Sequence, residues 1–190
     1  EEKYKKRRRT MSSNVFLADG FEEIEGLTVV DLLRRAGEEV ETVSIMGRKQ
    51  IEGSHKIKVE ADALFEKRIL PRANAGSARW NAGNQTSGAY KPLTDMLVTG
   101  MQEETAGSDL AAPSVFGDLG ILKGKEAVCY PGFEERLTGA TIGEGTVAVT
   151  DHVITSRGMG TAIDFAAALI ARLQDEKKSE EIKTSIIYRQ

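Results

Sequence analysis

Three side chains in this sequence offer a thiol or an imidazole: Cys129, His55 and His152. A single cysteine excludes an internal disulfide, and a free thiol is typical of a reducing compartment, which favours a cytoplasmic protein. The two histidines lie far apart in the sequence, and with one cysteine they form no zinc-ligand spacing. We therefore expect no metal site, while sites made of carboxylates alone stay open.

The composition is that of an ordinary globular protein. Its 190 residues suffice for one domain with a core, and 40% of them are hydrophobic and 29% charged. The 26 basic and 29 acidic side chains give a formal charge of −3, so bulk charge does not favour nucleic acid as a partner. No apolar run is long enough to cross a membrane, and no apolar signal core follows the basic N-terminus.

Residues 1–10 differ from the rest of the chain. They contain a basic run, Lys5–Arg9, which would suit a nuclear signal or an anionic surface. We favour the alternative, a disordered leader or vector sequence, because Met11 resembles a natural start. We accordingly expect a tail over 1–10 and a single domain over 11–190.

The elements that would position chemical groups begin with a strand, a helix and a second strand. Residues Asn14–Ala18 form a short apolar run, Glu25–Ala36 has helical spacing, and Val40–Ile45 is again apolar. The helix is expected to bury one stripe, which consists of Leu27, Val30, Leu32 and Leu33. Strand–helix–strand units with short connections predict an α/β fold with a parallel sheet.

The remaining pattern continues this alternation, apart from one stretch. It predicts a hairpin over 51–60, a short helix over 111–119, a strand over 127–130, paired strands over 146–155, helices over 160–173 and 175–184, and a last strand over 185–188. Residues 67–110 are rich in Gly, Asn, Ser and Thr, hold the only Trp (Trp80) and show no sustained period. So long a stretch without a pattern argues against a simple assignment within a compact domain.

Specific motifs occur in three stretches: Phe16–Gly37 (FLADGFEEIEGLTVVDLLRRAG), Ala111–Val128 (AAPSVFGDLGILKGKEAV) and Ile154–Leu173 (ITSRGMGTAIDFAAALIARL). In this order and at these distances they resemble the ThiJ/PfpI superfamily, in the branch of the parkinsonism-associated protein deglycase and bacterial ThiJ-like proteins. The resemblance implies a flavodoxin-like three-layer sandwich with a mainly parallel sheet. It also implies a homodimer that needs no cofactor.

In that family a cysteine lies on a sharp strand-to-helix turn, where the helix N-terminus stabilises its thiolate. The family's elbow reads Ile-Cys-Ala-Ala-Pro, and the cysteine position here is Leu110, which has no nucleophile. Ala111 follows, where the resemblance places backbone N–H groups that receive a developing oxyanion. The glutamate that hydrogen-bonds to the sulfur matches Glu25. The alternative role for Glu25 is a first-turn carboxylate that favours the helix dipole.

Three further residues near this elbow match the family in part. A histidine found near the cysteine in some members aligns with Tyr130, which makes Tyr130 a candidate substrate-binding residue. Cys129 is either a displaced nucleophile or, as we prefer, an inert thiol in a buried strand. Arg157 matches a family arginine and is expected to have a structural role or to lie at a dimer interface.

A shift of reading frame would account for residues 67–110. The family has Leu-Val-Leu-Pro-Gly-Gly-Met-Pro-Gly before the elbow, and codons chosen for Asn74–Gly83 spell most of this motif when read one base later. Codons for Ala106–Leu110 similarly yield Leu-Ala-Ala-Ile and the start of a cysteine codon. The hypothesis is that segments of roughly 67–87 and 99–110 are out of frame, around an in-frame amphipathic helix over Gly88–Leu97.

A sequence error, a frameshifted gene and a deliberately altered chain would each produce this pattern. If the residues are real, the sheet is expected to lose a central strand and its elbow. A loss on that scale should exceed the usual stability of about 5–15 kcal/mol, so poor folding is expected.

The resemblance implies functions that differ in what they need at position 110. With a cysteine there, it implies glyoxalase or deglycase chemistry on small reactive aldehydes such as methylglyoxal, or on glycated groups, with Glu25 as proton shuttle. An oxidation-sensing or chaperone-like dimer also needs that cysteine. With Leu110 in place, a catalytically inactive scaffold remains.

Overall fold

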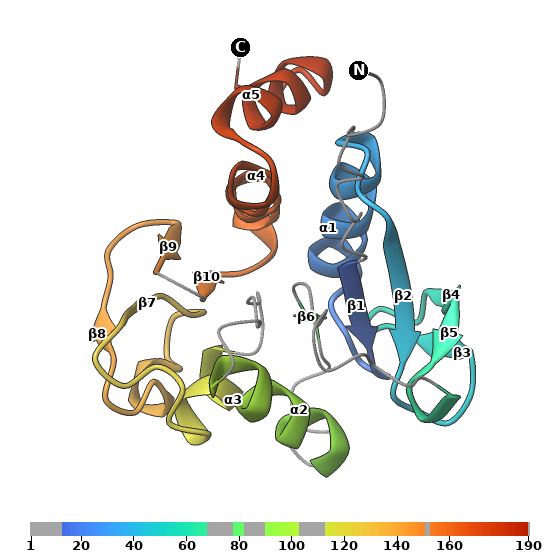
Figure 1. Ribbon diagram of the computed structural model, residues 1–190, viewed down its shortest axis with the longest axis horizontal. Helices are drawn as coiled ribbons and strands as arrows, with labels where there is room; N and C mark the ends of the chain where they lie inside the picture. The colour runs from blue at the N-terminus through green and yellow to red at the C-terminus, as the bar shows by residue number, and fades with distance from the viewer. Residues whose placement is uncertain (1–12, 68–77, 82–89, 103–112, 151–152, 190) are drawn as a thin grey trace, which may run out of the picture.

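The computed structural model describes residues 13–67, 78–81, 90–102, 113–150 and 153–189 of the chain (Figure 1). Within these ranges the main sheet is parallel, with the strand order β5-β2-β1-β6. Its strands are β1 (Ser13–Leu17), β2 (Val40–Ser44), β5 (Ala63–Leu64) and β6 (Ala78–Asn81). Helices pack on both faces of this sheet, which confirms the expected flavodoxin-like three-layer α/β architecture.

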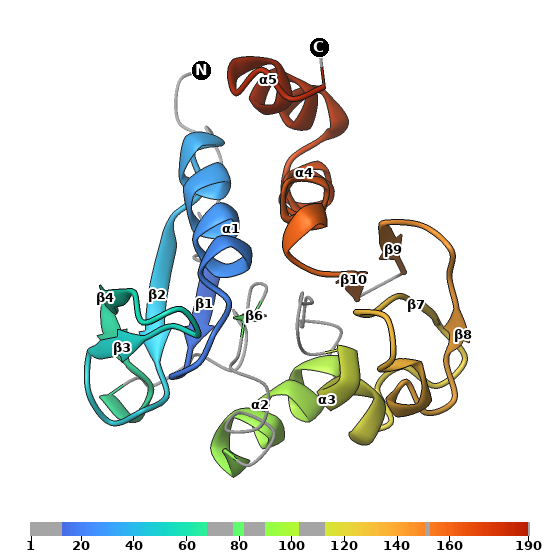
Figure 2. The same cartoon turned by 180° about the vertical axis from the view of Figure 1, so that it is seen from behind.

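The described helices fall into two groups. α1 (Glu23–Arg35) packs on α4 (Ala162–Leu173), which in turn packs on α5 (Glu176–Ser185). α2 (Lys91–Gln102) and α3 (Pro113–Asp118) lie together, away from those three helices (Figures 1 and 2). Short 3₁₀ turns are formed by Phe65–Lys67, Glu134–Arg136 and Met159–Thr161. No helix in these ranges is long and apolar enough to cross a membrane.

Strand β1 shows why both faces of the sheet are covered. Successive side chains of a strand point to opposite faces. Val15 and Leu17 belong to a buried cluster with residues of α1 and α4, whereas Phe16 and Ala18 belong to a second cluster with residues of α2 and α3. A strand that is buried on both faces has a continuous apolar sequence, and the strand predicted over 14–18 has such a sequence.

Three strand pairs lie outside the main sheet in the described part of the chain. β3 (Gln50–Glu52) and β4 (Lys58–Glu60) are antiparallel, which confirms the hairpin predicted over 51–60. β9 (Val147–Val149) and β10 (Ile154–Ser156) are also antiparallel and confirm the paired strands predicted over 146–155. β7 (Glu126–Ala127) and β8 (Thr141–Ile142) form a short parallel pair.

Helix α1 confirms the helix predicted over 25–36 but buries a different stripe. Val30, Leu32 and Leu33 are buried as expected, whereas Leu27 is 36% exposed. Each residue advances about 100° around a helix, so Leu27 lies well to one side of the buried Gly26 before it. At the start of the helix the buried stripe therefore runs through Gly26 rather than through Leu27.

Two predicted strands are wrong in extent or type. The strand predicted over 127–130 ends early, because the N–H of Val128 donates to the side-chain hydroxyl of Thr155 in β10 (2.9 Å) rather than to a backbone carbonyl. The residues predicted as a strand over 185–188 close α5 instead. The N–H groups of residues 186–188 donate to carbonyls in the last turn of that helix, so they are not free to pair with a sheet.

The atypical stretch over 67–110 contains two described elements. β6 pairs in parallel with β1, so part of this stretch does supply a strand to the sheet. The expected loss of the central strand that leads into the elbow concerns residues up to 110, and residues 103–112 lie outside the described part of the chain. α2 agrees with the amphipathic helix predicted over 88–97 where the two overlap, and Leu93 and Leu97 are buried in the second cluster. Local apolar spacing is therefore sufficient to predict α2, whereas β6 is held in the sheet by pairing with β1.

Candidate active site at the start of the first helix

The first turn of α1 gathers three carboxylates just after β1. Glu22 is the N-cap residue, and its Oε2 accepts a hydrogen bond of 2.7 Å from the N–H of Glu25. Glu23 and Glu25 are both buried. Carboxylates are favoured at a helix N-terminus because they cap free N–H groups and interact with the helix dipole. The sequence EEIE therefore starts the helix and brings Glu25 into its first turn.

Glu25 was predicted as the acid–base residue, and the structure buries it to 6% exposure. Its Oε2 atom has no hydrogen-bond partner among the residues that the structure describes. Burial, followed by the negative charge of Glu22, raises the pKa of the Glu25 carboxyl from 4.5 to about 7. At neutral pH both protonation states are populated, so the group can donate or accept a proton.

Tyr130, the predicted substrate-binding residue, lies near Glu25, with Gly158 between them. Tyr130 is 65% exposed, and its ring meets that of Phe133 edge-on at a centroid distance of 6.3 Å. A Cβ atom placed on Gly158 would lie 3.2 Å from Tyr130 Cδ2 and 3.4 Å from Glu25 Oε1. Gly158 has a φ of 144°, which L side chains rarely adopt. The structure thus brings two predicted residues together on a glycine that sequence reasoning missed.

The other two predicted catalytic positions, Leu110 and Ala111, lie outside the described residues, as does His152. The described chain resumes with α3, whose first residues, Pro113 and Ser114, are buried. The roles of Leu110 and Ala111 stay predictions from the family resemblance.

Cys129 has the surroundings of a structural thiol. It is buried within the second core cluster. Burial and then the charge of Glu134 raise the pKa of the thiol, against the opposing charge of Arg157. Because the thiolate is the nucleophilic form, these surroundings disfavour Cys129 as a displaced nucleophile. Arg157 is half-buried and acts electrostatically on Cys129, in keeping with a structural role.

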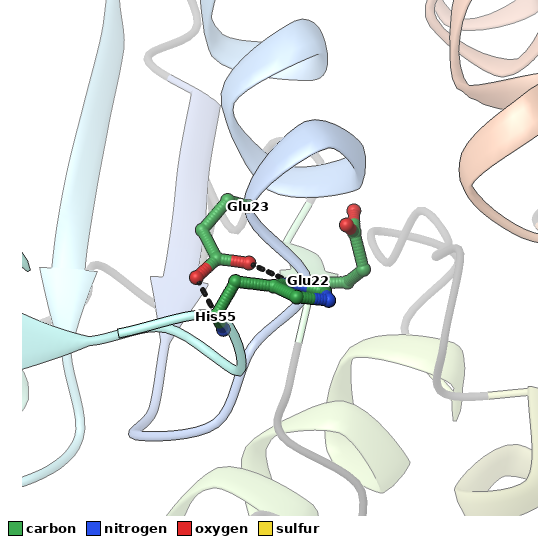
Figure 3. Close-up of side chains that lie close together, drawn as sticks. All are labelled: Glu22, Glu23 and His55. Atoms are coloured by element: carbon green, nitrogen blue, oxygen red, sulfur yellow. Dashed lines mark hydrogen bonds and ion pairs between the residues drawn. The ribbon is translucent and has the colours of Figure 1, made fainter. Parts of the chain in front are cut away.

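Glu23 contacts a different part of the chain, the loop between β3 and β4 (Figure 3). Its Oε1 accepts a hydrogen bond from the N–H of His55 (2.7 Å), and its Oε2 lies 2.9 Å from His55 Nδ1 and accepts from the Ser54 hydroxyl (3.1 Å). Burial alone would raise the pKa of Glu23, but hydrogen bonds, led by that from the His55 side chain, lower it from 4.5 to about 2. Glu23 is therefore an ionised carboxylate at neutral pH.

Glu22, Glu23 and His55 are also the one group of cation-ligand types found in the described chain, with one atom of each within 4.8 Å of the others. Both oxygens of Glu23 already accept hydrogen bonds from the loop, and an oxygen of Glu22 caps α1. A cation would have to displace these donors. We therefore assign no metal ligand here.

A cavity of about 480 Å³ is lined in part by Gly53 and Ser54 of the same loop. Its charged side chains are already paired, Asp19 with Arg48 and Glu52 with Lys56. Glu25 and Tyr130 do not line this cavity. The cavity is therefore separate from the Glu25 site.

A parallel sheet covered on both faces by helices defines a flavodoxin-like α/β protein, with a buried glutamate at the start of its first helix. The DJ-1/PfpI family model matches residues 11–74 and 110–172, and the chain belongs to this family. The match omits residues 75–109, which lie within the stretch whose composition is atypical. The ThiJ/PfpI resemblance is confirmed.

Known proteins of this family are similar along almost the whole chain. Protein DJ-1 homolog B of Arabidopsis thaliana is 32% identical over 199 residues, which cover 95% of this chain and 43% of that protein. The crystal structure of a cysteine-to-alanine mutant of a DJ-1 superfamily protein from Salmonella typhimurium is 26% identical with a TM-score of 0.85, and covers 95% of this chain and 100% of its own. Oxidized Toxoplasma gondii DJ-1 is 29% identical with a TM-score of 0.84 and the same coverage.

The chain spans less than half the length of the Arabidopsis relatives DJ-1 homolog A and DJ-1 homolog B. The activity, substrates and partners of those whole proteins are therefore matters for proposal.

Proposed function

We propose that this chain carries a cofactor-free glyoxalase- or deglycase-type site for small reactive carbonyl compounds, whose activity requires a cysteine at position 110. The observation that carries the proposal is the buried carboxyl of Glu25, with a pKa of about 7 and an oxygen that is unpartnered within the described ranges. A general acid–base is most effective when its pKa lies near the working pH. Membership of the DJ-1/PfpI family supports placing a reactive sulfur beside this carboxyl.

Methylglyoxal is a representative substrate for the proposed chemistry. A thiolate at position 110 adds to the aldehyde carbon, and the alkoxide takes a proton to give a hemithioacetal. Glu25 then removes the proton from this carbon and returns it to the neighbouring carbon, which converts the adduct to the thioester of lactate. Backbone N–H groups near Ala111 hold the oxyanion. Water cleaves the thioester, so methylglyoxal plus water gives lactate, and no oxidant or cofactor is consumed.

Leu110 favours a second function for the chain as it stands, that of a catalytically inactive scaffold. Leucine supplies no nucleophile, and the single cysteine, Cys129, is buried with a raised pKa. Oxidation sensing needs an exposed thiol of low pKa, which these surroundings do not provide. The proposal therefore assigns no carbonyl activity to the chain with Leu110.

The test compares the parent chain with Leu110→Cys for loss of methylglyoxal and formation of lactate. We expect no activity in the parent and measurable activity in Leu110→Cys. Leu110→Ser is the control, because a hydroxyl of similar size supplies no thiolate at neutral pH. Adding Glu25→Gln to Leu110→Cys should lower the rate by about 10²–10⁴-fold. Activity in the parent, or activity of Leu110→Cys that survives Glu25→Gln, would contradict the proposal.

We further propose a cytoplasmic homodimer. Proteins of the DJ-1 family are commonly dimeric. Ile24 and Leu27 lie three residues apart on α1 and expose apolar surface on one side of it, which a second copy would bury. The single cysteine supports a reducing compartment.

A further inference from the structure

One buried carboxylate fastens the loop between β3 and β4 to the start of α1. Both oxygens of Glu23 accept hydrogen bonds from this loop, which come from His55 and Ser54. The N–H of Ser54 also donates to the carbonyl of Phe21 (2.9 Å). A Cβ atom on Gly53 would overlap Glu23 Oε1, so the backbone of the loop lies directly against the carboxylate.

The two partners of this contact differ in their exposure to water. The side chain of Glu23 is 3% exposed, whereas that of His55 is 70% exposed. A buried charge that loses its hydrogen-bond donors is strongly unfavourable. Ionised Glu23 therefore stabilises the loop in the position where His55 and Ser54 donate to it. His55 lies on the solvent side and is the partner whose charge changes near neutral pH.

The charged groups that shift the pKa of His55 are both negative. Glu23 on α1 is its direct partner, and Glu22 at the N-cap is the next acidic group. On the loop itself, Lys56 pairs with Glu52 at 3.0 Å. The hydrogen bond and the charge of Glu23, against a smaller effect of burial, raise the pKa of His55 above its usual value of 6.5.

A raised histidine pKa means that protonation strengthens the contact. The added stability is fully present below pH 6.5, the pKa of His55 in a released loop, and it is lost as the pH rises through the raised value. Each unit by which the pKa is raised corresponds to about a tenfold change in the equilibrium between held and released loop.

We propose that Glu23 and His55 form a pH-responsive anchor, which holds residues 53–57 against the first turn of α1 when His55 is protonated and loosens when it is neutral. Glu23 and Glu25 lie in the same helical turn, in which Glu22 caps the N–H of Glu25. Glu23 is therefore a positioning residue, which acts on Glu25 through the backbone of this turn. When the pH changes the state of the anchor, the position of the Glu25 carboxyl changes with this turn. That consequence for activity rests on the proposed function, whereas the anchor itself does not.

Hydrogen exchange at the amide of His55, which donates to Glu23, tests the anchor directly. Exchange is measured at about pH 5.5 and 8.5, on either side of the histidine titration, and is corrected for the intrinsic rate at each pH. EDTA is present so that no cation competes for the carboxylates. We expect the protection of this amide in the parent chain to fall between the lower and the higher pH.

Two variants assign the effect to the imidazole. His55→Gln has a side chain that donates a hydrogen bond but does not titrate, so the pH dependence should be lost. Ser54→Ala is the matched control, because it removes a donor to the same carboxylate and keeps His55, so the pH dependence should persist. Equal protection in the parent at both pH values, or a pH dependence that survives in His55→Gln, would overturn the proposal.

An NMR titration of the His55 ring gives a second, independent readout. Its pKa should lie above 6.5 in the parent and return towards 6.5 in Glu23→Gln. A value at or below 6.5 in the parent would refute the anchor, even if Glu23→Gln fails to fold. Neither measurement needs carbonyl activity, so failure of the proposed function and failure of the anchor are distinguishable.

Discussion

The ring of Tyr130 and the carboxyl group of Glu25 share the backbone of Gly158 as a neighbour. Tyr130 follows β7, Glu25 belongs to α1, and Gly158 lies between β10 and α4. One glycine therefore joins three segments that are far apart in the sequence. The absence of a side chain at Gly158 leaves room for the aromatic ring and the carboxyl group to lie this close.

Replacing Gly158 with alanine should destabilise the protein. The added Cβ would lie 3.2 Å from the Tyr130 ring, and the φ of 144° is unfavourable for alanine. We expect a loss of about 1–3 kcal/mol in the free energy of unfolding, measured by urea denaturation. Gly160→Ala is the control, because apart from the two chain neighbours no atom of the described residues lies within 4 Å of its Cβ position, and it should change stability by less than about 0.5 kcal/mol. Equal stability of the two variants would contradict the described backbone.

Glu25→Gln should be more stable than the parent at high pH and similar to it at low pH. The pKa of Glu25 is about 7 in the folded protein and 4.5 when the group is free, so the folded state holds the proton more tightly. Below pH 4.5 both states are protonated and the carboxyl has no effect. From pH 4.5 to about 7 the parent loses about 1.4 kcal/mol per pH unit, or about 3 kcal/mol in all, and Gln escapes this loss.

Urea denaturation of both proteins at pH 4 and pH 8 measures this difference. Asp31→Asn is the control on the same helix, because Asp31 is exposed and pairs with Arg35 across one helical turn, a contact that contributes less than about 1 kcal/mol. If Glu25→Gln shows no gain relative to the parent between the two pH values, the carboxyl is not buried as described.

Ile24→Lys should weaken the proposed homodimer. Ile24 is 53% exposed on the outer side of α1, and a charge there would have to be desolvated on association. Sedimentation velocity should show a shift towards monomer. Ile187→Lys is the control, because Ile187 is 75% exposed beyond α5 and is not part of the proposed interface. An unchanged sedimentation coefficient for Ile24→Lys would place the interface elsewhere.

Mass spectrometry of the peptide that spans position 110 tests the reading-frame hypothesis. If the sequence is in error there, the purified protein should contain Ile-Cys-Ala-Ala-Pro. Asp-Leu-Ala-Ala-Pro would establish that Leu110 is real and that the family's thiol chemistry is absent. If Leu110 is real, we expect the protein to be a catalytically inactive scaffold.

The parts of the fold that follow from local patterns could be predicted from the sequence. A continuous apolar run was sufficient to predict β1, and helical spacing was sufficient for α1 and α4, because the pattern lies in residues that are close together in the sequence. The early end of β7 could not be predicted, because it depends on the hydroxyl of Thr155 in another segment. β6 likewise has no local signal of its own and depends on pairing with β1.

The candidate site was predictable in part. Family motifs pointed to Glu25 and Tyr130, which the structure brings together. The glycine of the TSRG turn, Gly158, was a usable signal that sequence reasoning passed over. Glu23 and His55 are 32 residues apart, and no spacing rule joins them, because their contact depends on how the hairpin folds onto the helix.

Glu23 and Glu25 lie on two different sides of one helical turn, which has a spectroscopic consequence. Around pH 6 Glu23, with a pKa of about 2, is a symmetric carboxylate, while most copies of Glu25, with a pKa of about 7, are a carboxylic acid with a distinct C=O bond. Infrared absorption separates these two functional groups. Infrared difference spectra against Glu23→Gln and Glu25→Gln would therefore assign one carboxylate band to the hairpin side of this turn and one carboxylic acid band to its Tyr130 side.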